Sequence, residues 1–210
     1  MERDFNREMK LSNMIAAVET EAENIMEEFT GFTDGMRMLL MLQRTKDGGH
    51  NKEEQRVFES YVTFDNEEFK RKLINLLFLK RIYGNVRIYM SANARNIKKV
   101  IREMHVALVD SYYDDTEKRD SVSRKLIKSP RHFVMQPTCR ETSHFLIDVD
   151  DIDGVDVMGD ALKAINELGV VELLRYKTKN GWHIVVEPFN LTLWKGPGEV
   201  KKDSLLLLSY

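Results

Sequence analysis

The sequence predicts an α+β fold with a mixed or antiparallel sheet backed by helices. Strand-like and helix-like segments alternate through the first half of the 210 residues, whereas strand-like segments follow one another in the second half. Asn180-Gly181 separates two of these later segments, and Asn-Gly is a strong signal for a β-hairpin. Alternating strands and helices favour a sheet that is covered by helices, and hairpins favour antiparallel pairing of strands. We therefore expect both arrangements in this chain.

The first 56 residues are predicted to form an N-terminal helical extension, with the main domain over residues 57–210. Residues 1–30 place apolar side chains on one stripe at helical spacing, and Gly31 ends this helix. We expect the stripe to pack on the body of the domain. Residues 36–43 are apolar but too few to assign to a strand or a helix. The stripe comprises Met14, Ile15, Val18, Ala22, Ile25, Met26 and Phe29.

Two strands, each followed by a helix, are predicted next. The strands cover residues 57–64 and 86–90, and the helices cover residues 67–83 and 97–113. Asp65-Asn66 precedes the first of these helices, and side chains of this kind accept hydrogen bonds from free N–H groups at a helix start. We therefore expect Asp65-Asn66 to cap that helix.

The second half begins with a polar, charged stretch over residues 114–131. A solvated loop is the expected structure, with a basic segment that faces nucleic acid as the alternative. The remaining segments predict a strand that ends in acidic residues, a short amphipathic helix, a hairpin and a final strand. They cover residues 144–150, 159–168, 170–188 and 205–210.

Composition restricts the classes of protein to consider. The net charge is −2, so any contact with nucleic acid must come from a local patch. The single cysteine, Cys139, excludes an intramolecular disulfide framework and a four-thiolate zinc site, and it fits a reducing compartment. No apolar signal core begins the chain, and no stretch approaches the length of a membrane span. We therefore expect a soluble, cytoplasmic protein without a membrane partner.

Asp148 and Asp150 follow an apolar run and are the first candidate site residues. In a strand, residues two apart lie on the same face, which brings the two carboxylates within several ångströms. Carboxylates that close repel each other, and a divalent cation such as Mg²⁺ or Mn²⁺ is a common way to hold both ionised. The alternative is a strand end that runs into a solvated acidic turn.

The sequence pattern alone indicates two further candidate site residues, His183 and Asp203. His183 follows a glycine-bearing turn that carries two lysines, so it can donate to a phosphate oxygen near backbone N–H groups. Alternatively, His183 is a buried strand residue bonded to a backbone carbonyl. Asp203 precedes a buried strand, where it completes a three-carboxylate metal site or only marks the strand edge.

Taken in order, these segments resemble the archaeo-eukaryotic primase superfamily, the primase-polymerases. The core of that family has an hhhDhD/E strand, an sxH strand and a final hD/E, where h is apolar and s is small. Ile147-Asp148-Val149-Asp150 fits the first motif, Gly181-Trp182-His183 fits the second, and Lys202-Asp203 stands where the third belongs. Residues 87–95 also look like an upstream strand and loop of that core, and the resemblance covers residues 57–210.

The resemblance implies nucleotidyl transfer on a modified RRM-like sheet. It implies nucleoside triphosphates and a single-stranded nucleic-acid template as partners, with a helicase or another replication protein acting in trans. The alternatives are a catalytically inactive primase-fold protein that binds nucleotide or nucleic acid, and a metal-dependent nuclease or phosphodiesterase. The implied roles are catalysis and binding of Mg²⁺ or Mn²⁺ by Asp148, Asp150 and Asp203, and nucleotide binding by His183, Lys177, Lys179 and Arg95, with Arg87 and Lys98 as weaker candidates.

Overall fold

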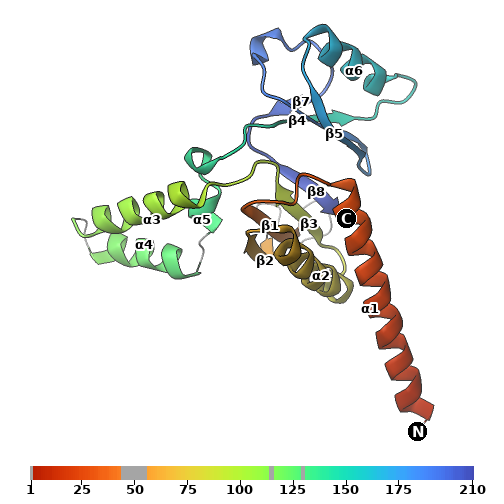
Figure 1. Cartoon of the computed structure of the whole chain (residues 1–210), viewed down its shortest axis with the longest axis vertical. Coiled ribbons are helices and arrows are strands. Elements are labelled where there is room, and N and C mark those ends of the chain that lie inside the picture. Colours follow the sequence, from red (N-terminus) through yellow and green to blue (C-terminus); the bar gives the residue numbers. More distant parts are fainter. Residues whose placement is uncertain (1, 44–55, 114–115, 129–130) are drawn as a thin grey trace. The chain divides into compact units, whose positions relative to one another are not determined.

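The chain folds into two packed units, and the structure, a computed structural model, describes residues 2–43, 56–113, 116–128 and 131–210 (Figure 1). Unit 1 comprises residues 1–90 and 207–210, and unit 2 comprises residues 91–206. The chain therefore enters unit 2 after Met90 and returns to unit 1 after Leu206. The division at residue 56 that the sequence suggests stays a prediction.

Unit 1 is built on a four-stranded sheet in the order β2-β1-β3-β8. β1 pairs antiparallel with both β2 and β3. The apolar residues 36–43, unassigned from the sequence, supply this inner strand, and six of the seven residues of β1 are buried. Helix α2 packs on β1 and β2, and α1 packs on α2. The elements are α1 (Glu2–Glu28), β1 (Arg37–Gln43), β2 (Arg56–Thr63), α2 (Asn66–Tyr83), β3 (Arg87–Ser91) and β8 (Leu205–Ser209).

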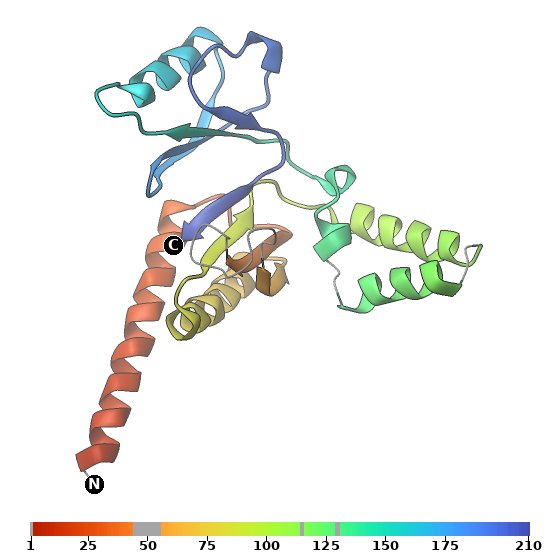
Figure 2. The ribbon, with the colours of Figure 1, turned by 180° about the vertical axis from the view of Figure 1, so that it is seen from behind.

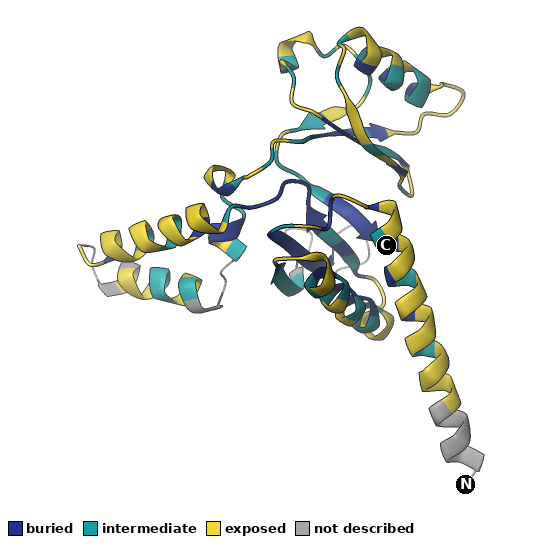
Figure 3. Cartoon of the chain, in the orientation of Figure 1, coloured by how far each residue is buried: buried dark blue, intermediate teal, exposed yellow. Residues whose placement is uncertain are grey.

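The apolar stripe predicted for the N-terminal helix packs only along the C-terminal half of α1. Val18, Ala22 and Ile25 are buried, as is Phe29 just beyond the helix, whereas Ile15 is exposed. Figure 3 shows the same change along the helix, from mostly exposed to partly buried residues. Asp65 caps α2 as predicted, because its side-chain oxygen accepts from the backbone N–H of Glu68 at 2.8 Å.

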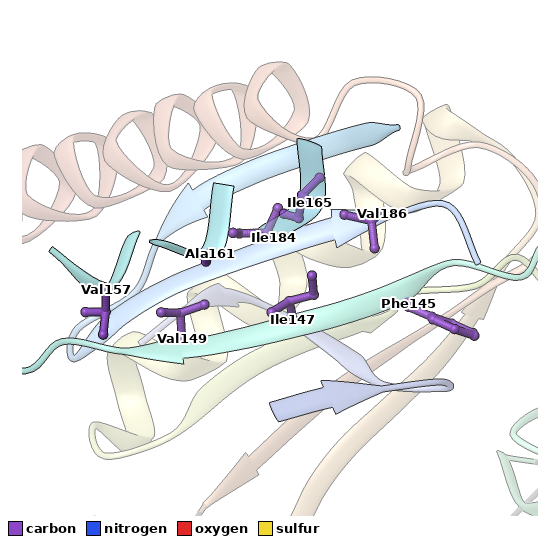
Figure 4. Packing of buried hydrophobic residues seen from close by; sticks show 8 residues of the cluster. All are labelled: Phe145, Ile147, Val149, Val157, Ala161, Ile165, Ile184 and Val186. Carbon is purple, nitrogen blue, oxygen red and sulfur yellow. The ribbon is translucent and has the colours of Figure 1, made fainter. Parts of the chain in front are cut away.

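Unit 2 contains a second four-stranded sheet, in the order β5-β6-β4-β7. All three pairings in it are antiparallel. Helix α6 packs its apolar side chains against β4 and β6, and Figure 4 shows the resulting core of eight buried residues. The elements are β4 (Phe145–Asp150), α6 (Val157–Glu167), β5 (Glu172–Lys177), β6 (Gly181–Val186), a 3₁₀ turn (Leu191–Leu193) and β7 (Glu199–Lys201).

The loop predicted over residues 114–131 is wrong over its middle, because Thr116–Lys128 forms helix α4. α4 runs beside α3 (Ile97–Ser111), as Figures 1 and 2 both show. Val122 and Leu126 are half-buried, while Arg124 and Lys125 are exposed. The segment has only three apolar residues among its thirteen, too few to reveal a helix against so many charges. Residues 114–115 and 129–130 lie outside the described residues, and α5 (Arg131–Val134) and a 3₁₀ turn (Pro137–Cys139) follow.

The α+β class is thus confirmed, with two antiparallel sheets in place of the one expected. Among the described residues, no helix combines the length and the apolar character needed to cross a bilayer.

Candidate functional site

The candidate site lies on the face of the second sheet that points away from α6. Phe145, Ile147 and Val149 belong to the core against α6. Successive side chains of a strand point to opposite faces, so Asp148 and Asp150 project from the other face. The predicted geometry for the two acids is therefore confirmed: they stand on one face of a single strand.

Strand register places a row of polar residues across this face. Asp148 lies directly opposite His183 of β6 and Glu199 of β7. His183 in turn lies opposite Tyr176 of β5. Residues opposite each other in antiparallel strands share a face and have adjacent Cβ atoms. The sheet thus brings Asp148 and His183 together, although 34 residues separate them in the sequence.

A chain of polar contacts links the members of this row. The Nε2 atom of His183 lies 3.3 Å from Oδ1 of Asp148, and the Nζ atom of Lys201 lies 2.6 Å from Oδ2. The hydroxyl of Tyr176 lies 2.6 Å from Nδ1 of His183. In a neutral imidazole, Nε2–H donates to the carboxylate, which leaves Nδ1 to accept from the tyrosine. Tyr176 and Asp148 together orient the histidine ring.

These contacts favour the ionised form of Asp148. The hydrogen bond from His183 is the main cause that lowers the pKa of Asp148; partial burial opposes it, and the hydrogen bond from Lys201 adds to the lowering. Partial burial alone would lower the pKa of Lys201, but the hydrogen bond and charge of Asp148 raise it overall. Asp148 and Lys201 therefore form an ion pair whose carboxylate side chain is 29% exposed.

The lowered pKa of Asp148 predicts a loss of stability in acid. A group with a lowered pKa stabilises the fold fully above its ordinary value, 3.8 for this residue, and loses that contribution as the pH falls below it. Trp182 and Trp194, the two tryptophans of the chain, both belong to unit 2, so their fluorescence follows its unfolding. We expect the free energy of urea unfolding, measured at pH 7, 4 and 3, to fall less with decreasing pH for Asp148→Asn than for the wild type. Equal losses would contradict this role for Asp148.

Two glycines let the neighbouring segments approach β4 beside the acids. A Cβ atom on Gly181 would lie 2.0 Å from the carbonyl oxygen of Val149, and one on Gly198 would lie 2.6 Å from that of Asp148. Gly198 also has φ +90°, a conformation that glycine adopts without strain. The small position of the sxH motif therefore has no room for a side chain, and the glycine there has a structural reason.

Asp203 is not brought to Asp148 and Asp150. The Nδ2 atom of Asn93 reaches both the Oδ1 atom of Asp203, at 3.3 Å, and the carbonyl oxygen of His144, at 3.2 Å. His144 precedes Asp148 by four residues, about 13 Å along a strand. Asp203 therefore lies toward the other end of β4, and the predicted three-carboxylate arrangement does not form.

Arg95 is the partner of Asp203. Its two terminal nitrogens lie 3.2 and 2.8 Å from the two carboxylate oxygens, a bidentate pair. The Arg95 side chain is 0% exposed, and it also donates to the carbonyl oxygen of Gln136. A guanidinium without exposed surface has no access to a triphosphate in this structure, so the contacts of Arg95 are structural.

The two lysines of the hairpin turn are placed apart from the acids. Lys177 lies opposite Trp182, which faces α6, and its Nζ atom lies 5.8 Å from the centre of the Trp182 ring. Lys177 therefore projects from the face opposite to Asp148, contrary to its predicted place beside His183. Lys179 is exposed at the tip of the turn. Of the weaker candidates, Lys98 is exposed on α3, and Arg87 belongs to unit 1.

The described residues also form a hollow of about 490 Å³ along α3. Its lining comprises three apolar residues and four polar ones: Ile101, Val106, Val109, Lys98, Arg102, His105 and Asp110. Lys98 lines it, but Asp148, Asp150 and His183 do not. The polar row is the candidate site, because it brings the motif residues Asp148 and His183 together, whereas the hollow has a single carboxylate, Asp110.

Sequence reasoning missed Tyr176 and Glu199 of the row, and also Lys201, which contacts Asp148 from β7. Residues 199–201 alternate polar, apolar and polar, which is the signal of a strand, but three residues are too few to stand out. Tyr176 could have been found by counting back from the hairpin turn, since each strand residue then acquires a defined partner.

No group of three or more His, Cys, Asp or Glu side chains that could hold a metal ion occurs in the part of the chain that the structure describes. Comparisons of the chain with protein-family models, with curated proteins and with solved structures gave no match.

Proposed function

We propose that unit 2 is a metal-dependent nucleotidyltransferase of the primase-polymerase type, which joins nucleoside triphosphates on a nucleic-acid template. The observation that carries the proposal is the direct pairing of Asp148 with His183 across neighbouring strands, with Asp150 on the same face. Two carboxylates and an imidazole on one sheet face provide ligands for a cation and a donor for phosphate.

The residues present fit a magnesium or manganese ion that is shared with the substrate. Mg²⁺ is commonly bound by one or two carboxylates together with substrate phosphates and water, so a third protein carboxylate is not required. The ammonium of Lys201, 2.6 Å from Asp148, supports the assignment because it marks a position where this carboxylate attracts a cation. Asp148 and Asp150 would hold the ion.

When bound there, the ion would lower the pKa of an attacking 3′-hydroxyl and offset the charge that develops on the α-phosphate. Asp148 would remain ionised throughout, as its lowered pKa requires. Once an ion has taken its place at Asp148, the Nε2–H group of His183 would donate to a phosphate oxygen, while Nδ1 would still accept from Tyr176. Asp203 and Arg95 would maintain the structure of unit 2 at a distance from the reaction.

A primer-extension assay of the full-length protein tests this function. The protein is incubated with Mg²⁺ or Mn²⁺, labelled triphosphates and a primed or unprimed single-stranded template. We expect products longer than the primer, or dinucleotides on the unprimed template. Shortening of the template would identify a nuclease instead.

Asp150→Ala is expected to reduce product formation on the order of 100-fold, because one of the two carboxylates that hold the ion is lost. Asp153→Ala is the matched control: Asp153 is an exposed acid three residues further along the chain, and its loss should leave product formation unchanged. Equal effects of the two substitutions would contradict the assignment of Asp150.

Nucleotide binding without catalysis is the second candidate, and a specific observation favours it. Lys201 already compensates the charge of Asp148, and Arg95 already compensates that of Asp203. These two carboxylates therefore have counter-ions within the protein and need no metal ion for stability. Retention of a triphosphate analogue by the wild type, with no product under any condition of the extension assay, would support this candidate.

A further inference from the structure

We propose that Lys201 is a phosphate-binding residue that forms an ion pair with Asp148 until a divalent cation binds to that carboxylate. Lys201 then leaves Asp148, and its ammonium binds the triphosphate. This inference deepens the proposed function and rests on cation binding at Asp148. Lys201 belongs to none of the motifs that pointed to the site, and its role follows from its contacts alone.

Lys201 occupies one of the two Asp148 oxygens that a metal ion would use. Its Nζ atom lies 2.6 Å from Oδ2 of Asp148, while Oδ1 of the same carboxylate faces His183 at 3.3 Å. Both oxygens are therefore engaged by nitrogen atoms of the protein. A divalent cation in contact with Asp148 would repel the ammonium at this short separation, so binding of the two cations is competitive.

Lys201 can move without disturbing the sheet. It lies on β7, which forms one edge of the second sheet, and its side chain is 34% exposed. A lysine carries its charge on a flexible four-carbon stem, so the ammonium can shift while the backbone pairing of Lys201 with Leu146 stays in place. Glu199 lies 3.3 Å from the same ammonium and is mostly exposed, so it does not fix the lysine in a buried pocket.

The released ammonium stays on the face where the phosphates would bind. Lys201 reaches Asp148 from the β7 side, whereas His183 reaches it from the β6 side. A triphosphate that contacts an ion on Asp148 would therefore have a donor on each flank, Lys201 on one and His183 on the other. Lysine is a common phosphate ligand that acts as a point charge.

Binding of Mn²⁺ alone to the full-length protein gives the first test, because free Mn²⁺ can be counted by electron paramagnetic resonance without any reaction. We expect Lys201→Met to bind Mn²⁺ on the order of tenfold more tightly than the wild type, since the competing ammonium is gone. Lys202→Met is the matched control, because Lys202 is an exposed neighbour whose side chain should leave Mn²⁺ binding unchanged. Unchanged or weaker binding by Lys201→Met would overturn the proposal.

Binding of a non-hydrolysable triphosphate analogue at saturating Mn²⁺ gives the second test. We expect Lys201→Met to bind the analogue on the order of tenfold more weakly than the wild type, and Lys201→Arg to restore most of the affinity. The opposite signs of the two effects separate this role from a structural one, because misfolding would weaken both ligands. Analogue binding that is unaffected by Lys201→Met would overturn the phosphate-binding role.

The outcomes also separate this inference from the proposed function. If the wild type makes no product but Lys201→Met shows both binding effects, the proposal of nucleotidyl transfer is wrong. The exchange of Lys201 for a divalent cation at Asp148 then still stands. If the wild type makes product but Lys201→Met leaves Mn²⁺ binding unchanged, the exchange is wrong and the function stands. Absence of Mn²⁺ binding by the wild type and by Lys201→Met alike would overturn the exchange.

Discussion

Replacement of Asp148 by asparagine is expected to reduce nucleotidyl transfer on the order of 1,000-fold. The change keeps the size of the side chain and one oxygen acceptor but removes the negative charge that holds a cation. Asp148 also links β6 and β7, through His183 and Lys201. Asp148→Asn should therefore reduce product formation more than Asp150→Ala does, and the extension assay measures both variants.

Asp153→Asn makes the same chemical change at an exposed position and is the control for this experiment. The fold of each variant is checked by the tryptophan fluorescence of unit 2. Product formation by Asp148→Asn within tenfold of the wild type would exclude Asp148 as the residue that holds the cation.

Replacement of Arg95 by methionine is expected to lower the free energy of unfolding of unit 2 by about 3 kcal/mol. The Asp203 side chain is only 15% exposed, so removal of its bidentate partner leaves a largely buried carboxylate without a counter-ion. Urea unfolding followed through Trp182 and Trp194 measures the change. If Arg95 instead served only to bind triphosphate, the substitution would leave stability almost unchanged.

A control and a double substitution isolate the ion pair. Arg175→Met removes the partner of Glu172 in a surface pair 3.3 Å apart, which should cost less than about 1 kcal/mol. Adding Asp203→Leu to Arg95→Met removes the carboxylate that has lost its partner. The free energy of unfolding should therefore fall less in the double variant than the sum of the decreases in the two single variants. Strict additivity would show that the two residues do not act as a pair.

Much of the fold could be predicted because its signals are local. Asp65 caps α2 because a side-chain oxygen next to a helix start has a free N–H within reach. Phe145, Ile147 and Val149 alternate with Asp148 and Asp150, so the faces of β4 follow from the two-residue period of a strand. These features need no knowledge of distant residues.

Helix α4 and strand β7 could not be predicted because their signals are weak. α4 has a charged composition typical of a loop and takes its helical form beside α3. β7 is three residues long and is defined by its pairing with β4. In both cases packing against another element decides the local structure: the preceding helix α3 for α4, and the distant strand β4 for β7.

The sequence by itself determined the α+β class, the strand that carries Asp148 and Asp150, and the hairpin that presents His183. Tertiary structure alone decided which of the predicted residues meet. The register of β4 with β6 and β7 sets Asp148 beside His183 and Lys201, while the buried pair with Arg95 holds Asp203 toward the other end of the strand. The physical reason is that register and burial depend on the packing of segments far apart in the chain, and no single segment contains that information.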